Sequence, residues 1–173
     1  KGRKLFCLSG AVEKPGIYEV EFGITLRQLI DLGGGMRNGS TMQAILLGGA
    51  AGGFVGPNDL DLPLTMEATR AAGSSLGSGV VMVLDQSVDM VDQLRRIAAF
   101  FRDESCGQCV PCRVGTVRQE EIVSRLAKGV QSQDIELLRE LGTVMRDASI
   151  CGLGQTANSA IDSAINKLKV FAV

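Results

Sequence analysis

The chain has 173 residues, of which 45% are apolar, and its formal net charge is −1 from 18 basic and 19 acidic residues. This balance provides no electrostatic footprint for nucleic acid or for an anionic membrane surface. The sequence contains no histidine, which excludes catalysis by Ser–His or Cys–His pairs. The five cysteines are therefore the residues with the most distinctive chemistry.

Targeting signals are not evident in the sequence. The longest weakly polar stretch, residues 44–56, has 13 residues and five glycines, whereas a membrane-spanning helix needs about 20 apolar residues. The chain begins Lys1-Gly2-Arg3 without an initiator methionine or a secretory leader, which favours a fragment or a trimmed chain. Clustered cysteines suit a metal site in a reducing compartment, so we expect a cytoplasmic protein with no direct membrane insertion.

The first half has the pattern of a small β-rich domain. Residues 5–8 and 17–22 read as two strands joined by a Pro15-Gly16 turn. Thr25 and Gln28 form a capping box for a helix that the glycines at 33–35 end. Two more strands are predicted at residues 44–47 and 80–84. Hairpin, crossing helix and returning strands are the element order of a β-grasp domain, which we predict for residues 1–87.

Two features of this half are assigned to structure alone. Cys7 lies between Phe6 and Leu8 in the first predicted strand, so we expect it to be a small buried core residue and not a ligand. The glycine-rich segments 33–35 and 48–53 lack the Gly-x-Gly-x-x-Gly and Gly-Lys-Ser/Thr patterns that cradle phosphates. Loop geometry is their expected role.

The second half, residues 88–173, has helical periodicity and only six of the 22 glycines lie after residue 90. Apolar residues recur at spacings of three and four in residues 88–103, in about 114–128, after Ser132, and in 157–168. The sequence therefore predicts an α+β protein in which a β-grasp domain precedes a small four-helix bundle.

The cysteines of the second half have the spacing of iron–sulfur ligands. Cys106, Cys109 and Cys112 follow a Cys-x-x-Cys-x-x-Cys pattern, and Cys151 lies far downstream. Three such thiolates can wrap three corners of a [4Fe–4S] cube while a remote cysteine binds the fourth. A structural zinc site is the alternative, because four thiolates also suit tetrahedral Zn²⁺. Zinc sites usually present two separate Cys-x-x-Cys pairs, so this spacing favours the cluster.

Neighbouring residues are compatible with a tight ligand loop. Gly107 allows the backbone to approach a cluster closely, and Pro111 is expected to stiffen the turn before the third cysteine. Arg113 and Arg118 are either charges that offset the negative cluster and raise its reduction potential, or ordinary solvated charges on a helix. We assign neither arginine to the site.

Four segments carry a resemblance to a known family. Residues 104–115, Glu-Ser-Cys-Gly-Gln-Cys-Val-Pro-Cys-Arg-Val-Gly, resemble the cluster-binding signature of the flavoprotein subunit of respiratory complex I. The same signature occurs in diaphorase subunits of NAD-dependent hydrogenases and formate dehydrogenases. Residues 149–154 resemble the fourth-ligand segment of this family, and residues 9–16 and 76–85 are similar to its β-grasp domain of the soluble-ligand-binding type.

The resemblance implies an electron relay within an oxidoreductase. In the family, a preceding domain holds FMN and receives hydride from NADH, and nothing in this chain matches that domain. The cluster then relays single electrons to partner subunits, which include a thioredoxin-like [2Fe–2S] subunit and a larger iron–sulfur subunit. The chain alone is expected to have no catalytic residue and no hydride transfer activity. A eukaryotic source would imply the mitochondrial matrix.

Two other functions remain open from the sequence. The first is a diaphorase subunit of an NAD(P)-dependent hydrogenase or a formate dehydrogenase, which the same signature fits. The second is a docking or ligand-binding module in which zinc holds the helices together. An independent enzyme is disfavoured, because the sequence offers no histidine and no evident pair of carboxylates.

Overall fold

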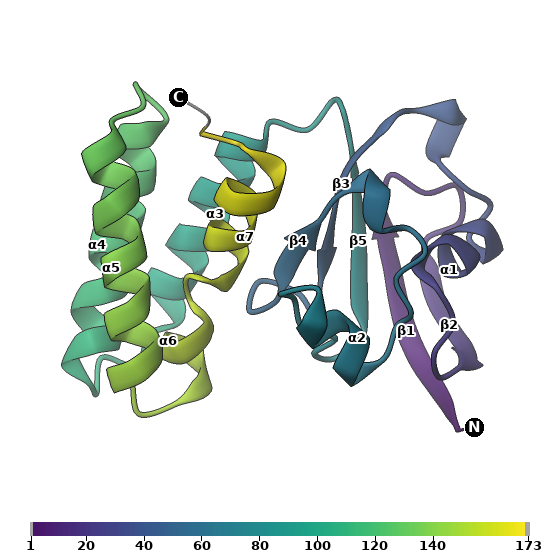
Figure 1. Cartoon of the computed structure of the whole chain (residues 1–173), viewed down its shortest axis with the longest axis horizontal. Coiled ribbons are helices and arrows are strands. Elements are labelled where there is room, and N and C mark those ends of the chain that lie inside the picture. Colours follow the sequence, from purple (N-terminus) through teal and green to yellow (C-terminus); the bar gives the residue numbers. More distant parts are fainter. Residues whose placement is uncertain (1, 172–173) are drawn as a thin grey trace. The chain divides into compact units, whose positions relative to one another are not determined.

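The computed structural model describes residues 2–171 and divides the chain into two compact units, Lys1–Val88 and Asp89–Val173. Figure 1 shows a sheet with short helices in the first unit and helices in the second. The chain is therefore of the mixed α+β class, as the sequence predicts. Each unit is described separately.

A mixed sheet of five strands, in the order β2-β1-β5-β3-β4, forms the first unit. Strand β1 pairs in parallel with β5, and the other neighbouring pairs are antiparallel. The strands are β1 (Arg3–Gly10), β2 (Gly16–Glu21), β3 (Met42–Leu47), β4 (Gly53–Val55) and β5 (Val80–Asp85). All four predicted strands are present. Strand β4 was not predicted, because a three-residue strand that begins with a glycine is too short to show a period.

Helix α1 (Leu26–Leu32) forms as its capping residues predict. The Thr25 side chain accepts a hydrogen bond from the Gln28 backbone N–H at 3.2 Å, and the Gln28 side chain accepts one from the Thr25 N–H at 3.0 Å. The helix ends at Gly33, which confirms the predicted stop. Helix α2 (Met66–Ala71) and two 3₁₀ turns, η1 (Arg37–Gly39) and η2 (Pro57–Asp59), complete the unit.

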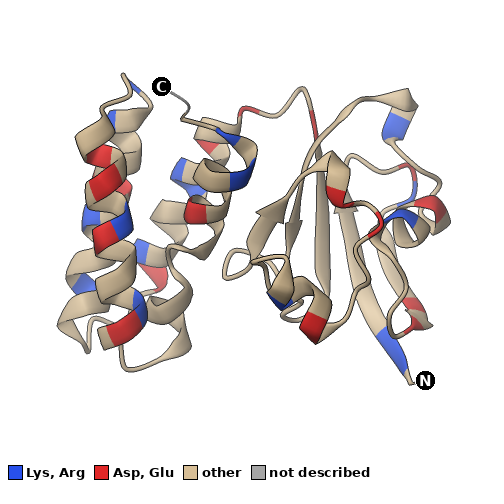
Figure 2. Cartoon of the chain, in the orientation of Figure 1, with Lys and Arg blue, Asp and Glu red and all other residues tan. Residues whose placement is uncertain are grey.

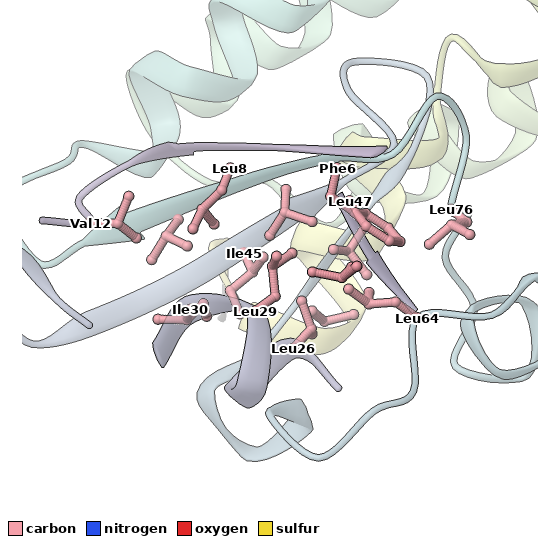
Figure 3. Close-up of a cluster of buried hydrophobic side chains, with 14 residues drawn as sticks. Phe6, Leu8, Val12, Leu26, Leu29, Ile30, Ile45, Leu47, Leu64 and Leu76 are labelled. Carbon is pink, nitrogen blue, oxygen red and sulfur yellow. The ribbon is translucent and has the colours of Figure 1, made fainter. Parts of the chain in front are cut away.

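The core of the first unit lies between α1 and one face of the sheet (Figure 3). Leu26, Leu29 and Ile30 of α1 point toward side chains of the strands, among them Leu8 and Ile45. Burial of one such side chain contributes about 1.5–3 kcal/mol to stability. The apolar residues at spacings of three and four in α1 therefore fix the face with which it covers the sheet.

The prediction that Cys7 is buried is wrong. Side chains alternate between the two faces of a strand, and Phe6 and Leu8 of β1 both point into the core. Cys7 consequently lies on the opposite face and is exposed. The short apolar run suggested a fully buried strand, whereas burial in β1 follows a period of two.

Gly10, at the end of β1, is expected to be the glycine of the sheet least tolerant of substitution. Its φ is +88°, and a Cβ there would lie 2.0 Å from the Val83 carbonyl oxygen. Gly10→Ala should lower the free energy of unfolding of the first unit by about 3 kcal/mol. Tyr18 is the only tyrosine and the chain has no tryptophan, so tyrosine fluorescence during urea unfolding reports this unit.

Gly35→Ala is the matched control for Gly10→Ala. Gly35 also has a positive φ of +78°, but a Cβ there meets nothing within 4 Å. This variant should lose about 1 kcal/mol from backbone strain alone. Equal losses in the two variants would show that the approach of Gly10 to β5 does not matter.

The second unit contains five helices among the residues that the structure describes: α3 (Met90–Glu104), α4 (Val110–Leu126), α5 (Ser132–Ala148), α6 (Gly152–Thr156) and α7 (Ser159–Leu168). Helix α4 packs on α3, α5 and α6, and α7 packs on α3 and α5. Arg102 of α3 pairs with Glu120 of α4, and Arg125 of α4 pairs with Asp134 of α5 at 2.6 Å.

The helical unit differs from the predicted four helices in two places. The five-residue helix α6 was not predicted, and α4 begins at Val110 rather than near Val114. Pro111 lies in the first turn of α4, where proline is tolerated because that N–H has no intrahelical partner. Pro111 thus lies in the first turn of a helix and not in a loop, and Cys112 belongs to that helix.

Charges of both signs are interspersed along the helices, for example on α4 and α5 (Figure 2). This distribution agrees with the nearly neutral net charge. Among residues 2–171, no helix is both long enough and apolar enough to cross a membrane.

Candidate functional site

Three of the four predicted ligands lie in the loop between α3 and α4 and in the first turn of α4. Helix α3 ends at Glu104, and Cys109 is the N-cap of α4, so Cys106 and Cys109 belong to the connecting loop while Cys112 lies in the first helical turn. Gly107 has a φ of +74°, a conformation that glycine adopts without strain. The sequence Cys-x-x-Cys-x-x-Cys therefore wraps a loop onto the start of a helix.

Arg113 holds this loop in place. Its guanidinium donates a hydrogen bond to the Gly107 carbonyl oxygen at 2.9 Å. The predicted alternatives for Arg113 were a charge that offsets the cluster or a solvated helix charge, and the structure reveals a contact with the loop itself. Arg118 instead pairs with Glu121 of the same helix at 2.6 Å, on the exposed surface.

The fourth predicted ligand lies at the junction of α5 and α6. Helix α5 is followed by Ser149 and Ile150, and Cys151 is the N-cap of α6. The Gln155 side chain of α6 donates to the Ser149 carbonyl oxygen at 3.0 Å, which closes the junction into a compact turn. Cys151 is exposed at the start of this short helix.

The two cysteine segments meet at the Cys109 thiol. The backbone N–H of Ile150 lowers the pKa of Cys109 most, and the N–H of Cys112 lowers this pKa further, against the opposing effect of desolvation. The Ser149 side chain also contributes to the lowered pKa, although its hydroxyl has no partner in hydrogen-bonding geometry among residues 2–171. The loop before α4 and the α5–α6 junction are thus side by side, and the lower pKa favours a thiolate.

Cys112 is packed against the same junction. A Cβ on Gly154 of α6 would lie 2.9 Å from the Cys112 Cβ and 2.3 Å from the Ser149 Oγ. The first turn of α4 and the first turn of α6 therefore approach so closely that only glycine fits between them. Cys112 is buried, Cys109 is half-buried, and Cys106 and Cys151 are exposed.

The chemistry of these donors suits an iron–sulfur cluster. Within the described part of the chain, no three His, Cys, Asp or Glu side chains converge as they would around a single metal ion. The four thiolates of a cubane bind different irons, so their sulfurs occupy separate corners instead of surrounding one point. Backbone N–H groups aimed at a sulfur, and the buried Ser149 hydroxyl without a partner among residues 2–171, are donors that a sulfur-rich group would use.

Sequence reasoning missed the two serines beside the cysteines. The Ser105 Oγ lies 3.3 Å from the Cys112 Sγ, and Ser149 is 7% exposed at the α5–α6 junction. In the sequence, only their positions near the cysteines could have pointed to them. Ser105 precedes Cys106 directly, and Ser149 lies two residues before Cys151.

Comparison with known families matches both units. Residues 92–170 match the NADH-ubiquinone oxidoreductase-F iron–sulfur binding region, and residues 5–55 match the SLBB domain. The first match contains all four predicted ligands, and the second contains most of β1 and all of β2, β3 and β4.

Named relatives align with almost the whole chain. The NADP-reducing hydrogenase subunit HndC of Solidesulfovibrio fructosivorans is 39% identical over 96% of this chain and 34% of its own length. The F subunit of NADH-quinone oxidoreductase in Mycobacterium bovis is 38% identical over 97% of this chain and 38% of its own length. The chain thus spans between one third and two fifths of these relatives.

A solved structure has the same fold. The NAD⁺-reducing [NiFe]-hydrogenase in its H₂-reduced state superposes with a TM-score of 0.83 and 34% sequence identity, over 98% of this chain and 29% of the hydrogenase chain. The air-oxidised state gives a TM-score of 0.85 and 33% identity. The family matches, the relatives and the fold agree with the resemblance in the cysteine segments. Residues 92–170 match the iron–sulfur binding region of the NADH-ubiquinone oxidoreductase-F type and residues 5–55 match an SLBB domain. Over almost its whole length, the chain is similar to part of NADH-quinone oxidoreductase F and of related hydrogenase subunits.

Proposed function

We propose that Cys106, Cys109, Cys112 and Cys151 bind one [4Fe–4S] cluster. The observation that carries this proposal is the meeting of the two cysteine segments, in which the Ile150 N–H contacts the Cys109 thiol and Gly154 abuts Cys112. A bound cluster supplies a one-electron redox couple. The chain contributes the four thiolates, the N–H groups that stabilise them, and a rigid scaffold for both segments.

Metal analysis tests the ligand proposal. The chain purified without oxygen should contain about four irons and about four acid-labile sulfides, as a cubane requires. Near-stoichiometric zinc with little iron in natively isolated, anaerobic protein would instead support the zinc-stapled docking module.

We further propose that the chain relays single electrons within an NADH dehydrogenase of the NADH-quinone oxidoreductase type. In this proposal, a preceding domain of the parent protein binds FMN and NAD(H), and partner subunits receive the electrons, among them a thioredoxin-like [2Fe–2S] subunit and a larger iron–sulfur subunit. The similarity to F subunits over almost the whole chain supports this reading. The parent would operate in the cytoplasm or, in a eukaryote, in the mitochondrial matrix.

A diaphorase subunit of an NAD(P)-dependent hydrogenase is the second candidate. The 39% identity with the NADP-reducing hydrogenase subunit and the fold match to the NAD⁺-reducing hydrogenase support it. Both candidates assign the same electron relay to this chain. They differ in the final electron acceptor. Reconstitution of the parent with quinone or with a hydrogenase partner separates them.

We assign residues 1–87 to a β-grasp domain of the soluble-ligand-binding type and residues 88–173 to a helical cluster-binding domain. The parallel pairing of β1 with β5 and the packing of α1 on the sheet support the β-grasp assignment. The family matches at residues 5–55 and 92–170 support the division. The helices α3, α4, α5 and α7 would form the bundle, with α6 as an added turn at the site.

The isolated chain should neither bind FMN nor oxidise NADH. Hydride transfer needs a cofactor that a protein domain positions, and this chain has no dinucleotide fingerprint. The measurement is NADH oxidation with an artificial acceptor, on the isolated chain and on the parent. In the parent, Cys109→Ser should spare flavin reduction by NADH and slow reduction of the partner. Robust turnover by the isolated chain would contradict the proposed location of hydride transfer.

A further inference from the structure

We propose that the hydroxyl groups of Ser105 and Ser149 donate hydrogen bonds to sulfur atoms at the cluster, Ser105 to the ligand thiolate of Cys112, and thereby raise the reduction potential of the cluster. The inference rests on the proposed function and adds two positioning residues that bind no iron themselves.

The direction of the Ser105 hydrogen bond follows from its neighbours. Ser105 Oγ lies 3.3 Å from Cys112 Sγ, and the Gly107 backbone N–H donates to the same oxygen at 3.3 Å. The oxygen therefore accepts the amide hydrogen, and its own hydrogen is left for the sulfur. A thiolate has no hydrogen to donate, so Cys112 becomes the acceptor once it binds iron.

Ser149 occupies the corresponding position on the other segment. Its side chain is 7% exposed, and its hydroxyl oxygen has no hydrogen-bond partner within residues 2–171. A buried hydroxyl without a partner costs free energy, and such groups in folded proteins usually have a function or an absent partner. The Ser149 Oγ and the Cys112 Cβ both border the Cα of Gly154, so the hydroxyl lies beside the ligand segment at the start of α4.

Gly154 keeps this arrangement compact. A Cβ at Gly154 would lie within 2.9 Å of the Cys112 Cβ and 2.3 Å of the Ser149 Oγ. Because Gly154 has no Cβ, the Ser149 hydroxyl can approach the ligand segment closely. The two serines come from different elements, because Ser105 is the C-cap of α3 and Ser149 is the C-cap of α5.

Hydrogen-bond donors near sulfur favour the reduced cluster. One-electron reduction adds one negative charge to a site that four thiolates already make negative. A hydroxyl dipole aimed at a thiolate stabilises the more negative state more strongly, and the reduction potential rises. Removing either hydroxyl should lower the potential without removing a ligand.

The test is a redox titration of the anaerobically purified chain with dithionite, followed by electron paramagnetic resonance. Ser105→Ala and Ser149→Ala should each keep full iron and sulfide content. Each should also shift the one-electron equilibrium toward the oxidised form by about tenfold, which is a fall of about 59 mV. Ser105→Thr keeps a hydroxyl and should keep a potential close to that of the unmodified chain.

Ser163→Ala is the matched control. Ser163 is also a buried serine, but its hydroxyl donates to the Ala160 carbonyl oxygen within α7. Loss of the Ser163 hydroxyl should leave the reduction potential of the cluster unchanged. The comparison therefore distinguishes the loss of a hydrogen-bond donor to sulfur from a general loosening of the helices.

The outcomes separate this inference from the proposed function. If the unmodified chain holds zinc or no cluster, the proposed function fails. If the cluster assembles but the potentials of the two alanine variants equal that of the Ser163→Ala control, the cluster assignment survives and the serine inference is wrong. Iron loss in Ser105→Ala with the fold intact would also overturn it, because the serine would then be needed for binding.

Discussion

Replacing any one of Cys106, Cys109, Cys112 and Cys151 by serine is expected to remove most of the iron, whereas Cys7→Ser should leave the iron content unchanged. A serine hydroxyl is a far weaker ligand than a thiolate for the irons of a cluster. The measurement is iron and acid-labile sulfide per chain after anaerobic purification, together with circular dichroism to show that each variant is folded.

The structure makes Cys7→Ser a sharper control than a buried cysteine would be. Cys7 is exposed on the face of β1 opposite the core, so the substitution buries no hydroxyl and should change the free energy of unfolding by less than about 0.5 kcal/mol. Cys112 is buried, and Cys112→Ser should cost stability as well as iron.

Two results would contradict the ligand set. Full iron in Cys151→Ser would show that the remote cysteine does not complete the cluster. Iron loss in a folded Cys7→Ser variant would show that the first unit takes part in metal binding. Partial loss in all variants alike, Cys7→Ser included, would indicate damage during purification and would be resolved by reconstitution with iron and sulfide.

Local sequence signals predicted the elements that depend on a few neighbouring residues. The capping box of Thr25 and Gln28 and the stop at Gly33 are satisfied within one turn of helix, so the residues alone define α1. The start of α4 was predicted four residues late, because Pro111 in a cysteine loop suggested a turn. Proline in the first turn of a helix and proline in a loop have the same local signal.

Features that depend on tertiary packing were less accessible to sequence reasoning. The apolar run around Cys7 could not show which face of β1 would be covered. Spacing grouped the cysteines correctly into two segments, but it could not show that Ile150 contacts Cys109 or that Gly154 abuts Cys112. The two serines were missed for the same reason, since Ser105 acts through its contact with Cys112 of α4 and Ser149 through the packing of the α5–α6 junction on α4.

Removing the iron is expected to loosen the helical unit selectively. The cluster would link the loop before α4 to Cys151, and such a link restricts the unfolded chain by about 3–4 kcal/mol, by analogy with a disulfide across a loop of similar length. Without it, α6 is held by its packing on α4 and α5 and by a few hydrogen bonds. These include the Gln155 bond to the Ser149 carbonyl and the bond from Gln119 to the Ala157 carbonyl at 2.9 Å.

Hydrogen exchange on the full chain, with and without an iron chelator under anaerobic conditions, measures this effect. A loss of about 3 kcal/mol corresponds to about a 100-fold fall in protection, which we expect for the amides of residues 106–116 and 149–158. Residues 3–85 serve as the internal control, because their core between α1 and the sheet contains none of the four predicted ligands. Unchanged protection at residues 149–158 after complete iron removal would mean that the protein scaffold alone, chiefly the packing of Gly154 on Cys112, holds the site together.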